Sequence, residues 1–206
     1  MNSILISLII MSIACGQFID AHAILELKQS SSCEWSDEKP TPEAQTYRLK
    51  DDTNSGTCIV ARFAGYLSWG PRYLELNNGT ILEGMSSCLG PVKKVGELEH
   101  RVATLAIEFD CAALVFEFIS FPQNQTFHVV SIAEEDSDNV DSFGHTPMRT
   151  QHPDHAYQCY SEQNFSLGGE AFHVSNITLE VSRDVRQPDF YQPVDHCSLD
   201  SPIKSA

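Results

Sequence analysis

The sequence has 206 residues, with 28 Asp or Glu against 13 Lys or Arg, so its formal net charge at pH 7 is −15. This length favours one domain with a sizeable core. A chain this acidic repels phosphate backbones, so we expect no nucleic-acid partner.

The first 23 residues, "MNSILISLIIMSIACGQFIDAHA", predict a cleaved signal peptide. The apolar run from Ile4 to Ile13 has the length of a signal-peptide core and is too short to span a bilayer. Small residues allow cleavage after Gly16 or after Ala23. No later segment is long and apolar enough to cross a membrane, so membrane attachment would require an anchor beyond Ala206.

The cysteine pattern predicts a disulfide framework rather than a metal site. Cys15 leaves with the signal peptide, and an even number remains: Cys33, Cys58, Cys88, Cys111, Cys159 and Cys197. An even number behind a signal peptide is typical of an oxidising compartment, and there is no C-x-x-C pair to suggest zinc. Six cysteines allow fifteen pairings, so spacing alone does not assign them.

Residues 24–45 are polar, contain "SSS" and "KPTP", and are predicted to form a linker. The strand pattern begins near Tyr47, with "TCIVARFAGYLSW" rich in β-branched and aromatic residues. In "RYLELNNGTILEG", the Asn-Gly pair between apolar stretches predicts a β-hairpin with Asn78 at its tip.

Three later segments alternate apolar and polar residues, as half-buried strands do. In "TLAIEFDC" we expect one face to carry Leu105, Ile107, Phe109 and Cys111, and the other Ala106, Glu108 and Asp110. In "ALVFEFISF" the apolar parity changes, which predicts a bulge or tight turn near 111–113 and places Leu114, Phe116 and Phe118 inward. In "SNITLEVS" the inward residues are Ile177, Leu179 and Val181. No long helical period occurs, so the predicted class is all-β and mostly antiparallel.

Residues 134–155, "EEDSDNVDSFGHTPMRTQHPDH", are predicted to be a long solvated connection. Its histidines, His145, His152 and His155, could hold a metal ion or act as a pH sensor, although a solvated loop is the simpler interpretation. Its carboxylates lack the glycine-hinged spacing of a calcium loop, so an acidic turn is preferred: Glu134, Glu135, Asp136 and Asp138. We therefore predict no metal site, while a pH-sensing loop remains a hypothesis.

Four N-x-S/T sequons occur, at Asn78, Asn124, Asn164 and Asn176. Asn78 lies at the predicted hairpin tip, Asn124 follows Pro122 in a predicted turn, and Asn176 falls on the polar parity of its strand. A glycan must face solvent, and these three positions do so. We expect at least two of the four to carry sugar.

No catalytic motif is present: the sequence lacks G-x-S-x-G, H-E-x-x-H and the glycine patterns of nucleotide sites. Cys111 is the nearest to a lone thiol, but its apolar strand parity favours a structural disulfide over a nucleophile. Trp35 and Trp69 are interpreted as packing residues. We therefore expect no enzyme activity and no cofactor.

Three blocks together resemble the luminal domain of lysosome-associated membrane glycoproteins. They are "TYRLKDDTNSGTCIVARFAGYLSW", "ALVFEFISFPQNQTFHVVSIAEE", and the pair "HAYQCYSEQNFSL" with "VSNITLEVSRDVRQPDFYQPVDHCSLD". In the last pair, a Tyr-x-Cys-x-Ser-Glu-Gln element is followed by a closing cysteine and a Cys-x-x-Asp sequence. The resemblance covers residues 46–200, leaving 201–206 as a tail. The luminal accessory subunit of the vacuolar proton pump has a related fold, but its signature is less like "CYSEQ".

The resemblance implies an antiparallel, β-prism or sandwich-like domain with two sequential disulfides, Cys58–Cys88 and Cys159–Cys197. Cys33 and Cys111 are extra to that pattern, and we infer a third pair between them. Family members continue after the last Cys-x-x-Asp into a transmembrane helix and a sorting tail, whereas this sequence ends with "SPIKSA".

The expected function is that of a non-catalytic, glycosylated domain of the lysosomal or late endosomal lumen, which shields the membrane or assists the vesicular sorting of protein cargo. The alternative is a soluble, extracellular binding module with the same fold. A hydrolase is the least favoured interpretation, because no nucleophile or acid–base pair can be named. The sequence does not determine the partner or the oligomeric state.

Overall fold

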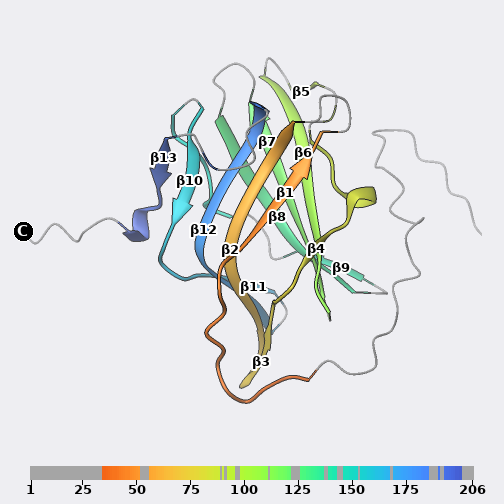
Figure 1. Ribbon diagram of the computed structural model, residues 1–206, viewed down its shortest axis with the longest axis vertical. Helices are drawn as coiled ribbons and strands as arrows, with labels where there is room; N and C mark the ends of the chain where they lie inside the picture. Colours follow the sequence, from red (N-terminus) through yellow and green to blue (C-terminus); the bar gives the residue numbers. More distant parts are fainter. Residues whose placement is uncertain are drawn as a thin grey trace, which may run out of the picture.

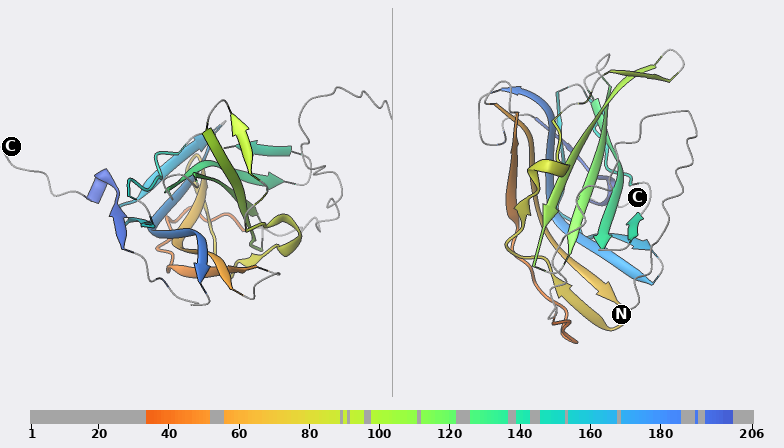
Figure 2. Two further views of the ribbon diagram at one scale, coloured as in Figure 1. Left: turned by 90° about the horizontal axis from the view of Figure 1, so that it is seen from above. Right: turned by 90° about the vertical axis from the view of Figure 1, so that its right-hand side faces the viewer.

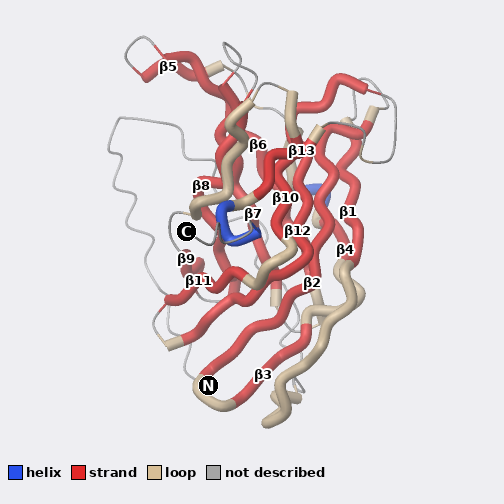
Figure 3. Tube along the Cα trace, turned by 90° about the vertical axis from the view of Figure 1, so that its left-hand side faces the viewer, coloured by secondary structure: helices blue, strands red, loops and turns tan. Residues whose placement is uncertain are grey.

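The computed structural model describes residues 34–51, 56–88, 90, 92–95, 98–110, 112–121, 126–136, 139–142, 146–152, 154–167, 169–185, 190 and 193–200. The signal-peptide prediction therefore lies outside the described residues. Within them, the chain forms strands β1 (Gln45–Lys50), β2 (Thr57–Trp69), β3 (Arg72–Glu75), β4 (Thr80–Ile81), β5 (Lys93–Val95), β6 (Leu98–Glu108), β7 (Ala113–Phe121), β8 (Thr126–Asp136), β9 (Asn139–Ser142), β10 (Ala156–Cys159), β11 (Gln163–Leu167), β12 (Glu170–Val185) and β13 (Val194–His196). Two single-turn 3-10 helices, η2 (Glu83–Met85) and η3 (Ser198–Asp200), complete the described elements (Figure 3).

The described strands form two sheets that face each other across the core (Figures 1 and 2). The seven-stranded sheet has the order β1-β2-β12-β10-β13, with β3 also paired to β2 and β11 to β12. The six-stranded sheet has the order β4-β6-β7-β8-β9, with β5 also paired to β6. All pairs are antiparallel except β10–β13, which is parallel. The predicted all-β, mostly antiparallel class is confirmed.

An aromatic cluster joins the two sheets at the centre of the core. The ring of Phe63 in β2 lies 5.4 Å from that of Phe116 in β7 and 6.4 Å from that of Phe172 in β12, centroid to centroid. All three side chains are at most 2% exposed. Burying a side chain of this size stabilises the fold by roughly 1.5–3 kcal/mol, so this cluster is a major source of the attraction between the sheets.

The predicted inward parity is confirmed in β6, β7 and β12. Leu105, Ile107, Leu114, Phe116, Phe118, Ile177 and Leu179 are fully buried, and Phe109 and Val181 nearly so. The parity change falls at a tight turn, in which the Phe109 N–H donates to the carbonyl of Ala112 at 2.8 Å and Glu108 pairs with Ala113. Cys111 itself lies outside the described residues.

The hairpin predicted at Asn78-Gly79 is wrong. β3 pairs with β2 in one sheet, whereas β4 pairs with β6 in the other, so the chain crosses between sheets at this point. Asn78 does adopt a positive φ of 55°, as a turn signal indicates. The hairpin is formed instead by the preceding Gly70-Pro71 pair, where Trp69 pairs with Arg72 and Gly70 has a φ of 58°.

The long solvated connection predicted over residues 134–155 is also partly wrong. β8 continues to Asp136 and pairs with β9, so Glu134, Glu135 and Asp136 belong to a strand. The neighbouring strand β7 offers backbone partners up to Glu135, and this pairing overrides the low strand propensity of acidic residues. The remaining irregular part follows β9, and its described residues begin at Thr146.

Part of the segment expected to be a linker lies against the domain. Ser36 forms a bridge with Tyr73, each donating its backbone N–H to the other's carbonyl at 2.7–2.8 Å. Trp35 packs against the core and meets Trp69 edge to face, with ring centroids 6.5 Å apart. Trp35 is thus a packing residue, whereas Trp69 is 61% exposed.

Gly79 provides a test of the crossover between the sheets. A Cβ added there would lie 2.6 Å from atoms of Ile107 and Phe109, and 2.9 Å from the Tyr47 hydroxyl. We therefore expect Gly79→Ala to lower the free energy of unfolding by about 1–3 kcal/mol in urea denaturation, because the rigid core must shift. The control Gly84→Ala meets nothing within 4 Å and should change stability by less than about 0.5 kcal/mol. Equal effects of the two substitutions would contradict the described packing.

Candidate functional site

The carboxylate of Asp195 is the centre of a polar cluster at one edge of the seven-stranded sheet. It is 8% exposed and lies on β13, where the parallel pairing with β10 places Asp195 opposite Tyr157. The disulfide Cys159–Cys197, with a Cα–Cα distance of 5.1 Å, joins the same two strands two residues further on. Strand pairing and disulfide together bring Asp195 beside the segment that precedes β10.

Both oxygens of this carboxylate are fully used. Oδ2 accepts the backbone N–H of Gln151 at 2.6 Å and that of His152 at 2.9 Å. Oδ1 lies 2.6 Å from Nδ1 of His152 and 3.0 Å from Nδ1 of His155. The two imidazole rings are 4.9 Å apart, because Asp154 between them takes a left-handed φ of 54° that turns the chain back. A short loop is thus held on one buried carboxylate, and we name His152, His155 and Asp195 the Asp195 cluster.

The hydrogen bonds of Asp195 determine its acidity. Burial alone would raise the pKa of the carboxyl, but hydrogen bonds from the His152 side chain, the His152 and Gln151 backbone and His155 outweigh it and lower the pKa to about 2. The carboxylate therefore stays ionised through the mildly acidic range of endosomes and lysosomes.

The structure brings together two of the three histidines singled out in the sequence. His152 and His155 meet on Asp195, whereas His145 lies outside the described residues. Asp195 was missed because it is 40 residues from His155. The implied Cys159–Cys197 disulfide could have indicated Asp195, because it brings the segments before the two cysteines side by side and so places Asp195 near Tyr157.

Residues 146–152 connect the two sheets. On one side this segment follows β8, where the Val129 N–H donates to the Met148 carbonyl at 2.9 Å and the Thr150 N–H donates to the Phe127 carbonyl at 3.1 Å. On the other side it ends on Asp195 of β13. Met148 and Thr150 are buried, while Arg149 is exposed. The Asp195 cluster therefore links the edge of one sheet to a strand of the other.

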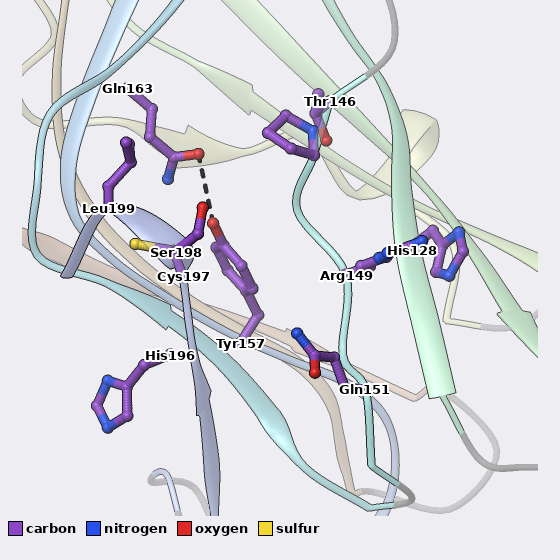
Figure 4. Close-up of a pocket in the computed structure, with 11 residues that line it drawn as sticks. His128, Thr146, Arg149, Gln151, Tyr157, Gln163, His196, Cys197, Ser198 and Leu199 are labelled. Atoms are coloured by element: carbon purple, nitrogen blue, oxygen red, sulfur yellow. Dashed lines mark hydrogen bonds between the residues drawn. The ribbon is translucent and has the colours of Figure 1, made fainter. Parts of the chain in front are cut away.

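A cavity of about 390 Å³ opens beside this segment (Figure 4). Among the described residues, no carboxylate lines it. The described lining residues are His128, Thr146, Pro147, Arg149, Gln151, Tyr157, Gln163, His196, Cys197, Ser198 and Leu199. Tyr157 and Gln163 point toward each other, and the imidazoles of His128 and His196 lie farther away on opposite sides (Figure 4). The cavity thus presents amide and hydroxyl groups at its centre.

Gln163 is an unusual feature of this cavity. The Tyr157 hydroxyl donates to its Oε1 at 3.3 Å, and its Nε2 is buried without a hydrogen-bond partner among the described residues. Whichever end of the amide faces Tyr157, the other end is left unpaired, which costs about 1–3 kcal/mol.

The two terminal sequence elements dock on each other through Asp200. Its Oδ1 accepts the Ser161 N–H at 2.9 Å and the Ser161 hydroxyl at 2.7 Å, and its Oδ2 accepts the Tyr160 N–H at 2.6 Å. Burial alone would raise the pKa of Asp200, and these hydrogen bonds outweigh it and lower the pKa. The Asp of Cys-x-x-Asp and the Ser of Tyr-x-Cys-x-Ser-Glu-Gln are therefore partners, just beside the disulfide.

A second polar cluster is formed by residues of β2, β11 and β12. Ser68 Oγ is 2.8 Å from Nε2 of His173, whose Nδ1 is 2.7 Å from Oδ1 of Asn164. The ring of His173 also stacks on Tyr66 at 4.4 Å, and Tyr66 and Lys39 both hydrogen-bond to Glu162. The order Ser68–His173–Asn164 resembles that of a hydrolytic triad. However, β2 pairs with strands on both sides at Ser68, so the Ser68 backbone N–H is not free to stabilise an oxyanion. We interpret this cluster as a hydrogen-bond chain that orients the sequon residue Asn164.

The sequon side chains that the structure describes face solvent. Asn78, Asn164 and Asn176 are exposed, and Asn176 has a positive φ of 50° at an irregularity between β12 and β2. Asn124 lies outside the described residues.

The disulfides Cys58–Cys88 and Cys159–Cys197 are present, with Cα–Cα distances of 5.5 and 5.1 Å. These are the pairs implied by the sequence resemblance. The inferred third pair, Cys33 and Cys111, lies outside the described residues. None of the helical segments that the structure describes has the length and apolar character needed to cross a membrane.

Three solved structures share this architecture over most of the chain. The membrane-proximal domain of mouse lysosome-associated membrane protein 1 has a TM-score of 0.54 and 17% identity, covering 78% of this chain and 100% of that one. Human lysosome-associated membrane protein 3 has a TM-score of 0.51 and 17% identity, covering 76% and 99%. This chain has the lysosome-associated membrane protein fold. The membrane-distal domain of mouse lysosome-associated membrane protein 2 also matches, with a TM-score of 0.51, 15% identity and coverage of 75% and 99%.

The similarity resides in the fold rather than in extensive sequence identity. No protein-family model matches the sequence, and no curated protein is significantly similar to it. The lysosome-associated membrane protein fold is thus retained here while most side chains differ.

Asp195 gives a pH prediction. Because its folded-state pKa of about 2 lies below its ordinary value of 3.8, its contribution to stability is complete above about pH 4 and is lost as the pH falls through about 2. We expect Asp195→Asn to lower the free energy of unfolding by about 2.5 kcal/mol at pH 5–7 and to flatten its decline between pH 4 and 2. Urea denaturation monitored by circular dichroism at several pH values measures both effects. The control Asp154→Asn changes a nearby exposed carboxylate and should leave the profile unchanged; a loss of the same size there would refute the assignment.

Proposed function

We propose that this chain is the glycosylated, non-catalytic luminal domain of a lysosome- or endosome-associated membrane glycoprotein, which shields the membrane or assists the vesicular sorting of cargo. The observation that supports the proposal is the lysosome-associated membrane protein fold, cross-linked by the disulfides Cys58–Cys88 and Cys159–Cys197. The docking of Ser161 and Tyr160 on Asp200 adds support, because it joins the two sequence elements on which the resemblance rests.

Surface chemistry also supports a shielding role. Exposed sequon residues lie on different parts of the fold: Asn78 between the sheets, Asn164 on β11 and Asn176 on β12. Glycans on these positions would cover several faces and hinder access by proteases. The formal charge of −15 adds repulsion between copies at neutral pH.

Acid tolerance is a further requirement of a lysosomal lumen. Carboxylates that hydrogen-bond strongly in the folded state stay ionised as the pH falls, so they do not drive unfolding there. Asp195 and Asp200 are both of this kind, with lowered pKa values, and both fasten segments near the Cys159–Cys197 disulfide.

Expression of the full-length coding sequence in cultured animal cells tests location. We expect the protein to co-fractionate with lysosomal markers and to be absent from the medium. Recovery of most of the protein from the medium would contradict the lysosomal proposal.

Digestion with a peptide N-glycosidase tests the glycans. We expect an increase in gel mobility, and Asn78→Gln, Asn164→Gln and Asn176→Gln should together abolish most of it, because at least two sequons are occupied. The control Asn77→Gln, next to a sequon but outside it, should leave the mobility unchanged. An identical mobility before and after digestion would rule out a glycan shield.

The second candidate function is that of a secreted binding module, and the cavity around Tyr157 and Gln163 favours it. A polar cavity with an unpaired amide is suited to a ligand or to a protruding side chain of a partner protein. Secretion into the medium, together with recovery of a partner whose binding is lost in Gln163→Leu, would support this candidate over the first.

A further inference from the structure

The Asp195 cluster has the composition and convergence of a metal site. His152, His155 and Asp195 each offer one ligand atom, and these atoms all lie within 4.8 Å of one another. We propose that this cluster binds a divalent transition-metal ion, with Zn²⁺ as the ion that its two imidazoles and one carboxylate favour. The sequence alone predicts no metal site, because the carboxylate ligand comes from the distant strand β13.

The distances between the ligand atoms are close to those that a metal requires. With bonds of about 2.0–2.1 Å to nitrogen and oxygen, neighbouring ligands of a tetrahedral Zn²⁺ are about 3.3 Å apart. Here Asp195 Oδ1 is 2.6 Å from His152 Nδ1 and 3.0 Å from His155 Nδ1. Increases of about 0.7 Å in the His152 distance and about 0.3 Å in the His155 distance would admit the ion. His152 can make this movement, because its side chain is 63% exposed.

The carboxylate is held as an oriented ligand. Its second oxygen, Oδ2, accepts two backbone N–H groups, so Oδ1 is fixed toward the imidazoles. Outer hydrogen bonds of this kind position metal ligands and are worth roughly 10–100-fold in metal affinity. The backbone of β13 is fixed in turn by the Cys159–Cys197 disulfide. Asp195, the ligand that is distant in sequence, is thus fixed in position before an ion binds. The loop that carries His152 and His155 moves to complete the coordination.

Metal binding would replace the two imidazole–carboxylate hydrogen bonds. Each imidazole would carry its proton on Nε2, which leaves Nδ1 free to coordinate the ion. Three protein ligands leave a fourth position for water or for a side chain of another molecule. The neighbouring group of Cys159, Cys197 and Asp200 is a poor competitor, because its two sulfurs form the disulfide and are not thiolate ligands.

Metal titration of the full-length glycoprotein, purified without a histidine tag and stripped with a chelator, tests the site at pH 7.5. We expect Zn²⁺ to bind with a stoichiometry of one by calorimetry, and Co²⁺ to give the intense visible absorption of tetrahedral coordination. The substitutions His152→Gln and His155→Gln should each weaken Zn²⁺ binding at least about tenfold and should remove the Co²⁺ band. These residues lie in a loop, so both variants should keep the circular dichroism spectrum of the wild type.

His128→Gln and His196→Gln are the matched controls, since both histidines lie near the cluster but outside it. They should leave affinity and absorption unchanged. The proposal is overturned if wild-type protein binds no Zn²⁺, or if the control and cluster variants lose affinity equally. It is also overturned if bound Co²⁺ is octahedral, which would indicate adventitious binding by surface carboxylates. Location and glycosylation do not enter this test, so its result is independent of the proposed function.

Discussion

The disulfide between Cys159 and Cys197 is the constraint on which this end of the molecule depends. It fixes the short strand β13 parallel to β10, a pairing of three residues that would be weak by itself. Closing a loop of 38 residues stabilises the fold by roughly 3–4 kcal/mol in the chain-entropy model. Every polar assembly described around Asp195, Asp200 and the cavity includes a residue within two positions of one of these cysteines.

Two carboxylates then extend the effect of the disulfide to the surrounding loops. Asp195 holds the segment 151–155, which is continuous with the bridge to β8, and Asp200 holds the backbone at Tyr160 and Ser161. Both act through backbone N–H groups, so they fix main chain rather than single side chains. Because these hydrogen bonds lower the pKa of each carboxyl, the arrangement persists at mildly acidic pH and is lost only below the ordinary range of an aspartate.

The weak sequence identity to proteins of the same fold has a physical explanation. Cores tolerate extensive exchange of apolar residues when volume and patterning are kept, whereas a disulfide with its docked carboxylate requires particular atoms. Asp200 with Ser161, and Gln163 with Tyr157, are interactions of the second kind, and they fall within the elements that resemble the lysosomal family. The Asp195 cluster lies next to them: His155 and Asp195 fall within the same elements, and His152 lies three residues before the first of them.

The sequence by itself determined the strands and their inward faces, because alternation in segments such as 113–121 follows directly from the two-residue period of a strand. It also indicated His152 and His155. The tertiary structure alone decided which strands pair: Asn78-Gly79 provides a turn, but a turn does not specify whether the next strand returns to the same sheet. Likewise, the acidic residues 134–136 form a strand because β7 and β9 pair with them. Asp195 joins the histidines because β13 is held beside β10. Local patterns report backbone geometry and burial, whereas contacts between residues 40 apart depend on how the sheets assemble.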